Sequence, residues 1–535
     1  MKKYIKFLFI ACLWASFSTS CYDDKSTERS TTLEDIVIDT TGLGMDLNVK
    51  FNHELKVNPK IYVGDEGNTS SLSYKWELSM EAGTDPDNFS EIGTEATLSK
   101  TIVNLPSVNP YILVLTVTNR NTELQKQVTW NVYVNNSLGE GLVVADTKDG
   151  GLTSDLSWVH CREVAEIYDG EDAVSRNLYS SVNGSNIEGK VTSMCYTSVL
   201  LISTRSYENR LYVGTDKDLF SVDPLTYKAV YSSNELFFAA PNNCSPSFLS
   251  NVNGGGNYFL AVVGGKLFYA PRATGYPSFG SALNYNSTLY DAGKYLAVET
   301  VGSNSPLVGS LSYYSEPNGT FVGKPTMMTA FPLATVTASD DPEFLPNNMP
   351  GMEVLGAGLG DGNLHYHFLK DKSSPTYYVC SLTKDSDGST IKGNKKLDIS
   401  TCTDISNSIQ GVFNPLQRIM YYATPDKIYA VNVLQAAGNV ATPVFDLAAQ
   451  VSASGDKITN MQLYQQAWYN LQSDNPAMTP IETNNKQLVV TTYNEQSGEG
   501  KIWLLPITNL ETGALGTAKT IPGFGEITCI STLPK

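Results

Sequence analysis

The stretch Leu211-Tyr212-Val213-Gly214-Thr215-Asp216-Lys217-Asp218-Leu219-Phe220 carries the pattern from which the fold is inferred. An apolar run rich in β-formers ends in a polar turn, and an aliphatic-aromatic pair follows the turn. This order is typical of a β-hairpin whose turn uses Gly or Asp. We therefore expect an all-β protein built from hairpins.

The hairpin pattern recurs along the C-terminal part of the chain. Further copies run from 259–263 to Leu267-Phe268, from 420–423 to Ile428-Tyr429 and from 488–491 to Ile502-Trp503, with weaker copies near Leu311-Ser312-Tyr313 and Tyr377-Tyr378-Val379. The first two hairpins are 48 residues apart (267 − 219) and the last two are 74 apart (502 − 428). A period of ~40 to 50 residues made of hairpins predicts a β-propeller.

The predicted propeller covers residues 137–535. At that period it holds seven or eight blades, and seven is favoured because the longer late spacings indicate loop insertions. Gly141-Leu142-Val143-Val144-Ala145 is expected to pair with strands near 527–530 and so to close the ring, which removes open strand edges.

Residues 33–136 predict a separate β-sandwich. Alternating apolar residues mark strands at 72–78, 111–118 and 127–134, with turn residues between them. About a hundred residues of this kind, with a tryptophan in mid-strand, favour an Ig-like arrangement in which Trp76 belongs to the core. Asn135-Asn136-Ser137 is expected to be a linker.

The first 20 residues have the pattern of a lipoprotein signal peptide. Lys2, Lys3 and Lys6 precede a short apolar segment that ends before Cys21, and this segment is too short to span a bilayer. Cleavage would leave Cys21 as the lipidated N-terminus, followed by a Ser/Thr-rich tether over 21–32. Plain secretion is the alternative.

Two resemblances follow from these residues. Tyr22-Asp23-Asp24 resembles the surface-export signal of Bacteroides-type lipoproteins, although an ordinary polar linker would look similar. Tyr74-Lys75-Trp76 and residues 115–119 resemble strands of PKD-like domains, but Glu77-Leu78-Ser79 stands where that family has the rest of W-x-F-G-D-G.

The order of signal peptide, PKD-like domain and propeller resembles the PKD-like family of Bacteroides-type surface lipoproteins, over nearly the whole mature chain. The resemblance implies a lipid-anchored protein on the outer membrane that binds oligosaccharide, without cleaving it, for a TonB-dependent glycan importer. Two alternatives stay open, namely a protein-binding subunit of the importer complex and a propeller glycoside hydrolase.

The net charge and the cysteines indicate which partners and which covalent bonds to expect. The net charge is −17, and loss of the three signal-peptide lysines makes it −17 − 3 = −20. Such an acidic chain repels phosphate backbones, so nucleic acid is not expected as a partner. Six cysteines remain after Cys12 and Cys21, without a C-x-x-C pair, and we expect buried free thiols.

Motifs for catalysis and metal binding are weak, so neither a cofactor nor a metal is expected. Gly356 to Gly362 is Gly-rich but fails G-x-G-x-x-G at Asp361, and predicts a turn. His365 and His367 share one face of a strand but lack further ligands nearby. Asp385-Ser386-Asp387-Gly388 resembles a calcium loop, yet Lys396 stands at the bidentate position, so a hairpin turn is favoured.

Sugar rings are bound by flat aromatic faces with amides or carboxylates beside them. The aromatics that repeat with the hairpins (Phe220, Phe268, Tyr429 and Trp503) are expected in the core. The candidates for ligand binding are therefore aromatics outside the repeat. They are Trp468 and Tyr469 in Gln465-Gln466-Ala467-Trp468-Tyr469-Asn470, Tyr276, Phe279 and Tyr285 in a Gly/Ser/Pro-rich stretch, and Trp158.

Overall fold

In this computed structural model the described residues are 34–534, apart from sixteen internal segments. The segments left out are 52, 84–85, 105–106, 108, 136–138, 166–167, 169–171, 202–205, 253–257, 272–278, 284–290, 300–308, 327–331, 435–439, 451–454 and 467–482. The predicted signal peptide, Cys21 and the tether lie outside the described residues. The chain divides into two compact units, Met1–Asn135 and Asn136–Lys535.

The first unit consists of nine described strands. They are β1 (Ile36–Asp39), β2 (Asp46–Lys50), β3 (Glu54–Val57), β4 (Lys60–Val63), β5 (Leu72–Ser79), β6 (Phe89–Gly93), β7 (Leu98–Thr101), β8 (Tyr111–Asn119) and β9 (Gln125–Asn135). Five of them form one sheet in the order β2-β9-β8-β5-β6, in which β2 and β9 are parallel. The pairs β1-β4 and β3-β7 are separate two-stranded ladders. The three strands predicted from alternation are β5, β8 and β9.

Two tryptophans lie at the centre of this unit. Trp76 on β5 and Trp130 on β9 are both fully buried, and their rings stack with centroids 5.7 Å apart. Alternate residues of β8 (Leu113, Leu115 and Val117) are also fully buried, as expected for a strand with one face toward a core. The prediction that Trp76 is a core residue is confirmed.

The second unit is propeller-like, with seven sheets among its described residues. The first sheet contains β10 (Gly141–Thr147), β11 (Thr153–His160), β12 (Ala173–Ser175), β13 (Ile187–Glu188) and β38 (Glu526–Leu533). The next three sheets contain, in order, β14 (Val191–Leu201), β15 (Ser206–Thr215), β16 (Leu219–Val222) and β17 (Ala229–Tyr231); β18 (Pro246–Val252), β19 (Tyr258–Val263) and β20 (Lys266–Pro271); and β21 (Ala297–Val298), β22 (Leu311–Ser315), β23 (Thr320–Lys324) and β24 (Ala334–Thr335). The last three contain β25 (Met352–Leu359), β26 (His365–Asp371), β27 (Tyr377–Lys384) and β28 (Ile391–Asp398); β29 (Gln410–Phe413), β30 (Ile419–Ala423), β31 (Lys427–Asn432) and β32 (Thr442–Asp446); and β33 (Asp456–Leu463), β34 (Gln487–Asn494), β35 (Glu499–Asn509), β36 (Ala514–Leu515) and β37 (Lys519–Phe524).

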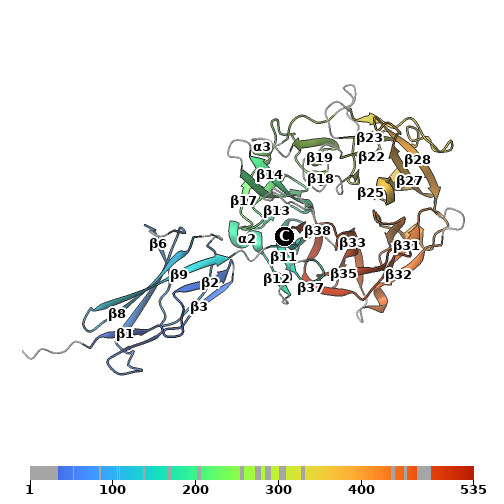
Figure 1. Ribbon diagram of the computed structural model, residues 1–535. Coiled ribbons are helices and arrows are strands. Elements are labelled where there is room, and N and C mark those ends of the chain that lie inside the picture. The colour runs from blue at the N-terminus through green and yellow to red at the C-terminus, as the bar shows by residue number, and fades with distance from the viewer. Residues whose placement is uncertain are drawn as a thin grey trace, which may run out of the picture. The chain divides into compact units, whose positions relative to one another are not determined.

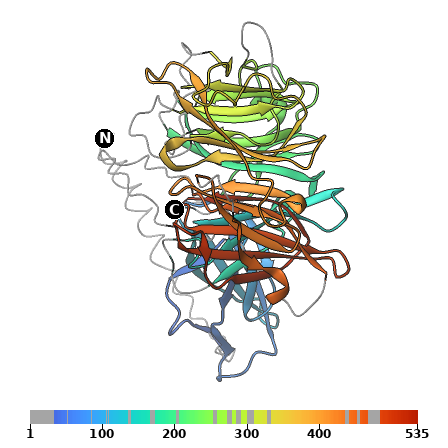
Figure 2. The same cartoon turned by 90° about the vertical axis from the view of Figure 1, so that its right-hand side faces the viewer.

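The sheets follow one another around a ring in chain order (Figure 1). Figure 2 shows this unit from the side, with the C-terminus at one face of the ring. The repeated hairpins of the sequence are β15-β16, β19-β20, β30-β31 and β34-β35, which all pair antiparallel. The weaker copies near Leu311 and Tyr377 lie on β22 and β27.

The last strand of the chain lies beside the first strand of the second unit. β10 pairs antiparallel with β38, with Gly141 opposite Leu533 and Val144 opposite Ile530. The sheet order is β12-β11-β10-β38, so one sheet contains both ends of the unit. A side chain also connects the first strands of two successive sheets, because Gln410 on β29 donates to the main-chain carbonyl of Met461 on β33 at 2.8 Å.

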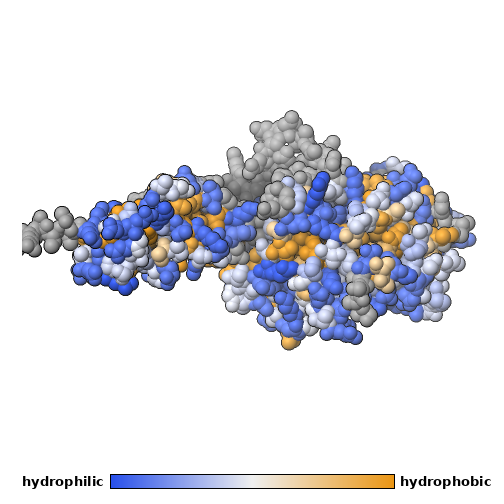
Figure 3. Space-filling view, turned by 90° about the horizontal axis from the view of Figure 1, so that it is seen from below, coloured by the Kyte–Doolittle hydropathy of each residue, from blue (hydrophilic) through white to orange (hydrophobic). Residues whose placement is uncertain are grey.

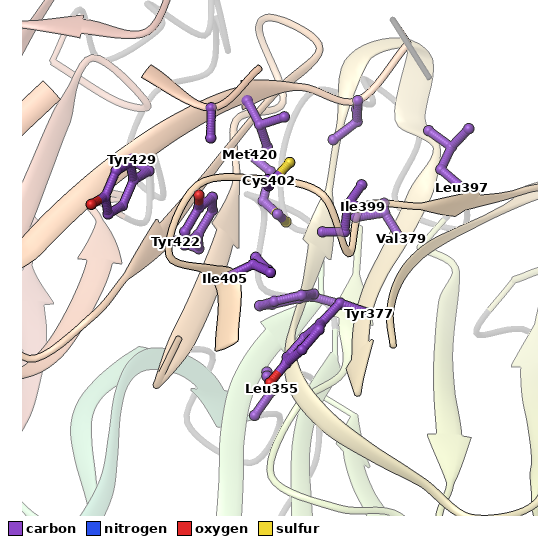
Figure 4. Close-up of a cluster of buried hydrophobic side chains, with 14 of the residues drawn as sticks. Leu355, Tyr377, Val379, Leu397, Ile399, Cys402, Ile405, Met420, Tyr422 and Tyr429 are labelled. Atoms are coloured by element: carbon purple, nitrogen blue, oxygen red, sulfur yellow. The ribbon is translucent and has the colours of Figure 1, made fainter. Parts of the chain in front are cut away.

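Apolar side chains fill the spaces between neighbouring sheets. Figure 4 shows one such cluster, in which Tyr377 and Val379 of β27 pack with Met420 and Tyr422 of β30. Three of the four repeated aromatics are buried in clusters of this kind, namely Phe268, Tyr429 and Trp503. Phe220 is only half-buried, against the ring of Tyr179. The prediction of an inter-blade core thus holds for three of the four.

The Gly-rich run is only in part a turn. Gly356 and Gly358 lie within β25, and the turn begins at Gly360. A Cβ atom on Gly356 would lie 2.1 Å from the Gly411 carbonyl oxygen of the neighbouring sheet, which explains glycine at this position. A 3-10 turn and strand β26 follow the run, whereas a dinucleotide-binding loop would be followed by a helix.

The six cysteines of the described residues are free thiols, as predicted. Four are buried and two, Cys195 and Cys529, are half-buried. The part of the surface visible in Figure 3 is largely hydrophilic, with smaller hydrophobic patches. Among the described residues, no helix has the length and apolar character needed to cross a membrane.

Replacing Trp76 with alanine should lower the free energy of unfolding of the first unit by about 3 to 5 kcal/mol. The change removes a fully buried ring and its stacking contact with Trp130. Chemical denaturation followed by tryptophan fluorescence measures this loss. Met80→Ala is the matched control, since Met80 is 63% exposed and should change stability by about 0.5 kcal/mol or less. Equal effects of the two variants would contradict the central role of Trp76.

Candidate functional site

Side-chain amides gather where the chain leaves β33 and where it enters β34. Gln465 donates to the Asn485 side-chain oxygen at 2.7 Å, and Asn484 donates to the Gln466 carbonyl at 3.0 Å. Asn485 has a φ of 62°, a left-handed conformation that asparagine tolerates better than most residues. These contacts hold the two ends of the connection together, and we call Gln465, Gln466, Asn484, Asn485 and Gln487 the amide cluster.

Gln466 connects the amide cluster to the paired strands β10 and β38. Its Nε2 donates to Glu140 Oε1 at 2.8 Å and to the Leu533 carbonyl at 3.1 Å. Both partners are acceptors, so the amide nitrogen must face them and Oε1 must point away. Glu140 and Gln466 are both buried. The orientation of the Gln466 amide is thus fixed by contacts that include Glu140, a residue 326 positions away in the sequence.

An aromatic run lies directly beside Glu140. Trp158 and His160 are two residues apart on β11, so their side chains share one face, and their rings stack at 5.3 Å. Tyr168 continues the run with its ring centroid 5.8 Å from that of His160. Nδ1 of His160 lies 2.8 Å from the Glu140 carbonyl oxygen, so this nitrogen carries a proton and donates to that oxygen.

The outer end of the aromatic run is charged. Tyr168 donates to Asp172 at 2.8 Å, and the Lys519 ammonium lies 2.7 Å from Asp172 and 2.8 Å from Glu163. Hydrogen bonds from Lys519 and Tyr168 lower the pKa of Asp172. Burial alone would raise the pKa of Glu163, but hydrogen bonds from Lys519, from its own backbone N–H and from the Cys161 thiol together outweigh burial, so the pKa is lowered. Both carboxylates therefore stay ionised at neutral pH.

Three buried polar atoms of the amide cluster and the adjoining Thr483 lack a hydrogen-bond partner among the described residues. They are Gln466 Oε1, Gln487 Nε2 and Thr483 Oγ1. Gln466 and Gln487 are 3% and 5% exposed. Leaving such a group unpaired costs about 1 to 3 kcal/mol, so these atoms favour any molecule that brings matching donors and acceptors. Amides, a carboxylate and partly exposed rings together form a set suited to binding a polar ring compound.

Of the six aromatic residues that the sequence suggested for ligand binding, one lies in the aromatic run, one lies in the core and four lie outside the described residues. Trp158 belongs to the aromatic run but is only 4% exposed and donates to the Gly139 carbonyl, so it supports the run instead of offering an open face. Phe279 was expected in a binding loop, and that prediction is wrong: it is 1% exposed and packs on Phe237 and Tyr212. Trp468, Tyr469, Tyr276 and Tyr285 lie outside the described residues.

The sequence analysis missed the amide cluster as a unit. Gln465 and Gln466 were noted only as neighbours of Trp468, while Glu140, Asn484 and Gln487 were not considered. The one available signal was the number of amide residues on both sides of the same insertion, at 465–466 and 484–485. Glu140 could be found only through the pairing of β10 with β38.

His365 and His367 form a second buried polar network. Glu299 accepts from the Ser310 hydroxyl at 2.9 Å, and the chain continues through His365 Nε2 (3.0 Å), Ser312 (2.9 Å from His365 Nδ1) and His367 Nε2 (2.9 Å). A carboxylate only accepts, so Ser310 donates to Glu299 and His365 Nε2 donates to Ser310.

These histidines lie outside any cluster of metal-ligating side chains among the described residues. Both rings are almost fully buried, and among the described residues no group of three His, Cys, Asp or Glu side chains could hold a metal ion. The Asp385 loop is a hairpin turn between β27 and β28, as favoured from the sequence, in which Asp385 accepts from Thr390 at 2.6 Å. The histidines and this turn have structural roles.

The two histidines should make stability sensitive to acid. Burial lowers the pKa of each to about 3, below the ordinary 6.5 of the unfolded chain. Their contribution is therefore complete above pH 6.5 and is lost as the pH falls toward 3, by up to about 1.4 kcal/mol per pH unit for each histidine. Urea unfolding between pH 7 and pH 4 measures this slope.

His367→Phe should reduce the slope of unfolding free energy against pH by about 1.4 kcal/mol per pH unit, which corresponds to one proton fewer taken up on unfolding. His53, which is exposed, provides the control, because His53→Gln should leave the slope unchanged. An unchanged slope in His367→Phe would contradict the network.

Part of the chain matches a protein-family model. Residues 21–190 match the model of the PKD-like family, which confirms the PKD-like resemblance for that segment but not over nearly the whole mature chain. The match extends past the first unit through β13 of the second. No curated protein matches the sequence.

Several solved structures are similar in fold at very low sequence identity. The periplasmic gluconolactonase PpgL of Pseudomonas aeruginosa is 11% identical, with a TM-score of 0.37, over 74% of this chain and 99% of that one. Apo AztD of Citrobacter koseri is 10% identical, with a TM-score of 0.30, over 86% and 98%. PorZ of Porphyromonas gingivalis is 9% identical, with a TM-score of 0.27, over 74% and 56%.

Proposed function

We propose that this protein is a lipid-anchored, outer-membrane protein of the cell surface that binds an oligosaccharide without cleaving it and passes it to a TonB-dependent importer. The resemblance to Bacteroides-type glycan-utilisation lipoproteins motivates the anchor, the location and the importer. The binding site is the aromatic run together with the amide cluster.

The observation that carries the proposal is the contact between these two groups through one residue. The main-chain oxygen of Glu140 accepts from His160, and its carboxylate accepts from Gln466. A pyranose needs an aromatic face for its C–H side and amide or carboxylate groups for its hydroxyl rim. Tyr168 and His160 are partly exposed and Gln465 is exposed, so both requirements meet at a surface.

The scaffold of this function is proposed to be a closed propeller of seven blades. The seven sheets among the described residues support that count, and the pairing of β10 with β38 supports closure. In such a ring, the site lies at the seam between the first and the last blade.

The carboxylates beside the aromatic run favour binding over hydrolysis. A glycoside hydrolase needs one carboxylic acid whose pKa is raised so that it can donate a proton. Asp172 and Glu163 both contact Lys519, and the pKa of each is lowered. Neither residue suits the role of a general acid at neutral pH.

Tyr168→Ala should weaken glycan binding by roughly 5- to 150-fold, taking base-aromatic stacking as the nearest analogue, because it removes the most exposed ring of the run. A glycan array followed by calorimetry on the 22–535 fragment measures this change. Phe238→Ala is the matched control, since Phe238 is an aromatic side chain 82% exposed elsewhere on the second unit.

Three results would count against this proposal in different ways. Unchanged affinity in Tyr168→Ala with a loss in Trp468→Ala would move the site to the 467–482 segment. Binding of a partner protein but of no glycan would favour the importer-subunit function. Release of shorter sugars from a bound glycan would overturn the non-catalytic role.

Cys21→Ala should move the protein from the membrane fraction to the soluble fraction, because a lipidated cysteine is the single anchor expected from the sequence. Fractionation of cells followed by immunoblotting measures the distribution. The variant Cys161→Ala, which changes a buried thiol, should stay with the membrane. Membrane association of Cys21→Ala would overturn the lipid anchor.

A further inference from the structure

We infer that the site selects uncharged glycans and discriminates against those that carry carboxylate or sulfate groups. This inference rests on the proposed glycan-binding function and specifies its ligand class. It follows from the unpaired atoms of the amide cluster and from the charges around the aromatic run.

The unpaired oxygen of Gln466 requires a hydrogen-bond donor from the ligand. Its amide orientation is fixed, because Nε2 donates to two acceptors, Glu140 Oε1 and the Leu533 carbonyl oxygen. Oε1 is therefore an acceptor without a donor among the described residues. A carboxylate or sulfate group has acceptor atoms only at neutral pH, so it leaves this oxygen unpaired.

The other two unpaired atoms need different partners: one needs a hydrogen-bond acceptor, and the other can pair with an acceptor or a donor. Nε2 of Gln487 is a donor, and the Thr483 hydroxyl can donate and accept. A sugar hydroxyl donates one hydrogen bond and accepts others, so hydroxyls match the hydrogen-bonding type of each of these atoms. The same holds for an acetamido group. This complementarity is to neutral, hydroxyl-bearing rings.

The charges near the aromatic run reinforce this selection. Glu140, Glu163 and Asp172 lie along it, whereas the ammonium of Lys519 is shared between two of these carboxylates. Arg162, whose side chain is exposed, is the one Lys or Arg between Trp158 and Asp172 in the sequence. An anionic sugar would thus meet an excess of negative charge, on a protein whose net charge is −17.

The test compares neutral and acidic polysaccharides on the 22–535 fragment by affinity electrophoresis and calorimetry. The neutral probes are β-glucan, α-mannan, galactan and fructan, and the acidic probes are polygalacturonate and chondroitin sulfate. At least one neutral probe should bind at least about tenfold more tightly than both acidic probes. Raising the ionic strength to about 1 M, where the screening length falls to about 3 Å, should change the affinity for the neutral probe by less than about twofold.

Gln466→Leu should weaken binding of the neutral probe by about tenfold, because it removes the acceptor that the ligand pairs with. Gln487→Leu provides a second variant if the first fails to fold, since it removes the unpaired donor without touching Glu140. Gln450→Leu is the matched control, because Gln450 is exposed on the turn after β32. Melting temperatures of all three variants separate loss of binding from loss of fold.

The outcomes separate this inference from the function on which it rests. Tighter binding of an acidic probe, or strong weakening of neutral binding by salt, would overturn the selection for uncharged glycans while the glycan-binding function stands. Full affinity in folded Gln466→Leu and Gln487→Leu would overturn the role of the unpaired amides. Failure to bind any glycan would overturn the proposed function itself.

Discussion

The backbone hydrogen bonds between β10 and β38 are the constraint on which the second unit depends. They join Gly141 to Leu533, a separation of 533 − 141 = 392 residues. Neighbouring sheets bury apolar side chains against each other, and this pairing puts strands from both ends of the unit into one sheet. The cluster that includes Leu142, Val144, Val489 and Leu504 forms only because this pairing brings the two ends of the unit together.

The same pairing creates a polar region among apolar ones. Most contacts between sheets are made by apolar clusters, whereas Glu140, Gln466 and the Leu533 carbonyl meet through hydrogen bonds. Buried polar networks are stable only when their members are satisfied, and this one leaves three atoms unpaired. Stability alone would favour apolar side chains at this position, and the ligand site is proposed here for that reason.

Local patterns in the sequence were sufficient for most of the fold. Alternation alone located β5, β8 and β9 and placed Trp76 in the core, because strand periodicity directly reports which side chains face inward. Phe279 was misjudged because Gly, Ser and Pro around it indicate a loop, whereas its burial depends on Tyr212 and Phe237 from neighbouring elements. The shared face of His365 and His367 was predictable, but their serine partners, Ser312 on β22 and Ser310 just before it, were not.

The candidate site was the least predictable feature. Trp158 was identified as an unrepeated aromatic, but no local pattern connects it to the other site residues: its indole donates to the Gly139 carbonyl, and the next residue, Glu140, accepts from Gln466. Sites at a seam combine residues from both ends of a chain. Such sites become visible only when the strand order is known.

The buried thiols give the chain a set of internal reporters. Burial raises the pKa of Cys161 and Cys529 to about 12 and that of Cys402 to about 11. At neutral pH, thiolate is then outnumbered by thiol by roughly 10⁴ to 10⁵, and only the thiolate reacts with alkylating agents. Labelling of each cysteine therefore waits for its surroundings to open. Because these residues lie on different sheets or connections of the ring, their labelling rates would rank the local opening of one part of the ring against another without any introduced probe.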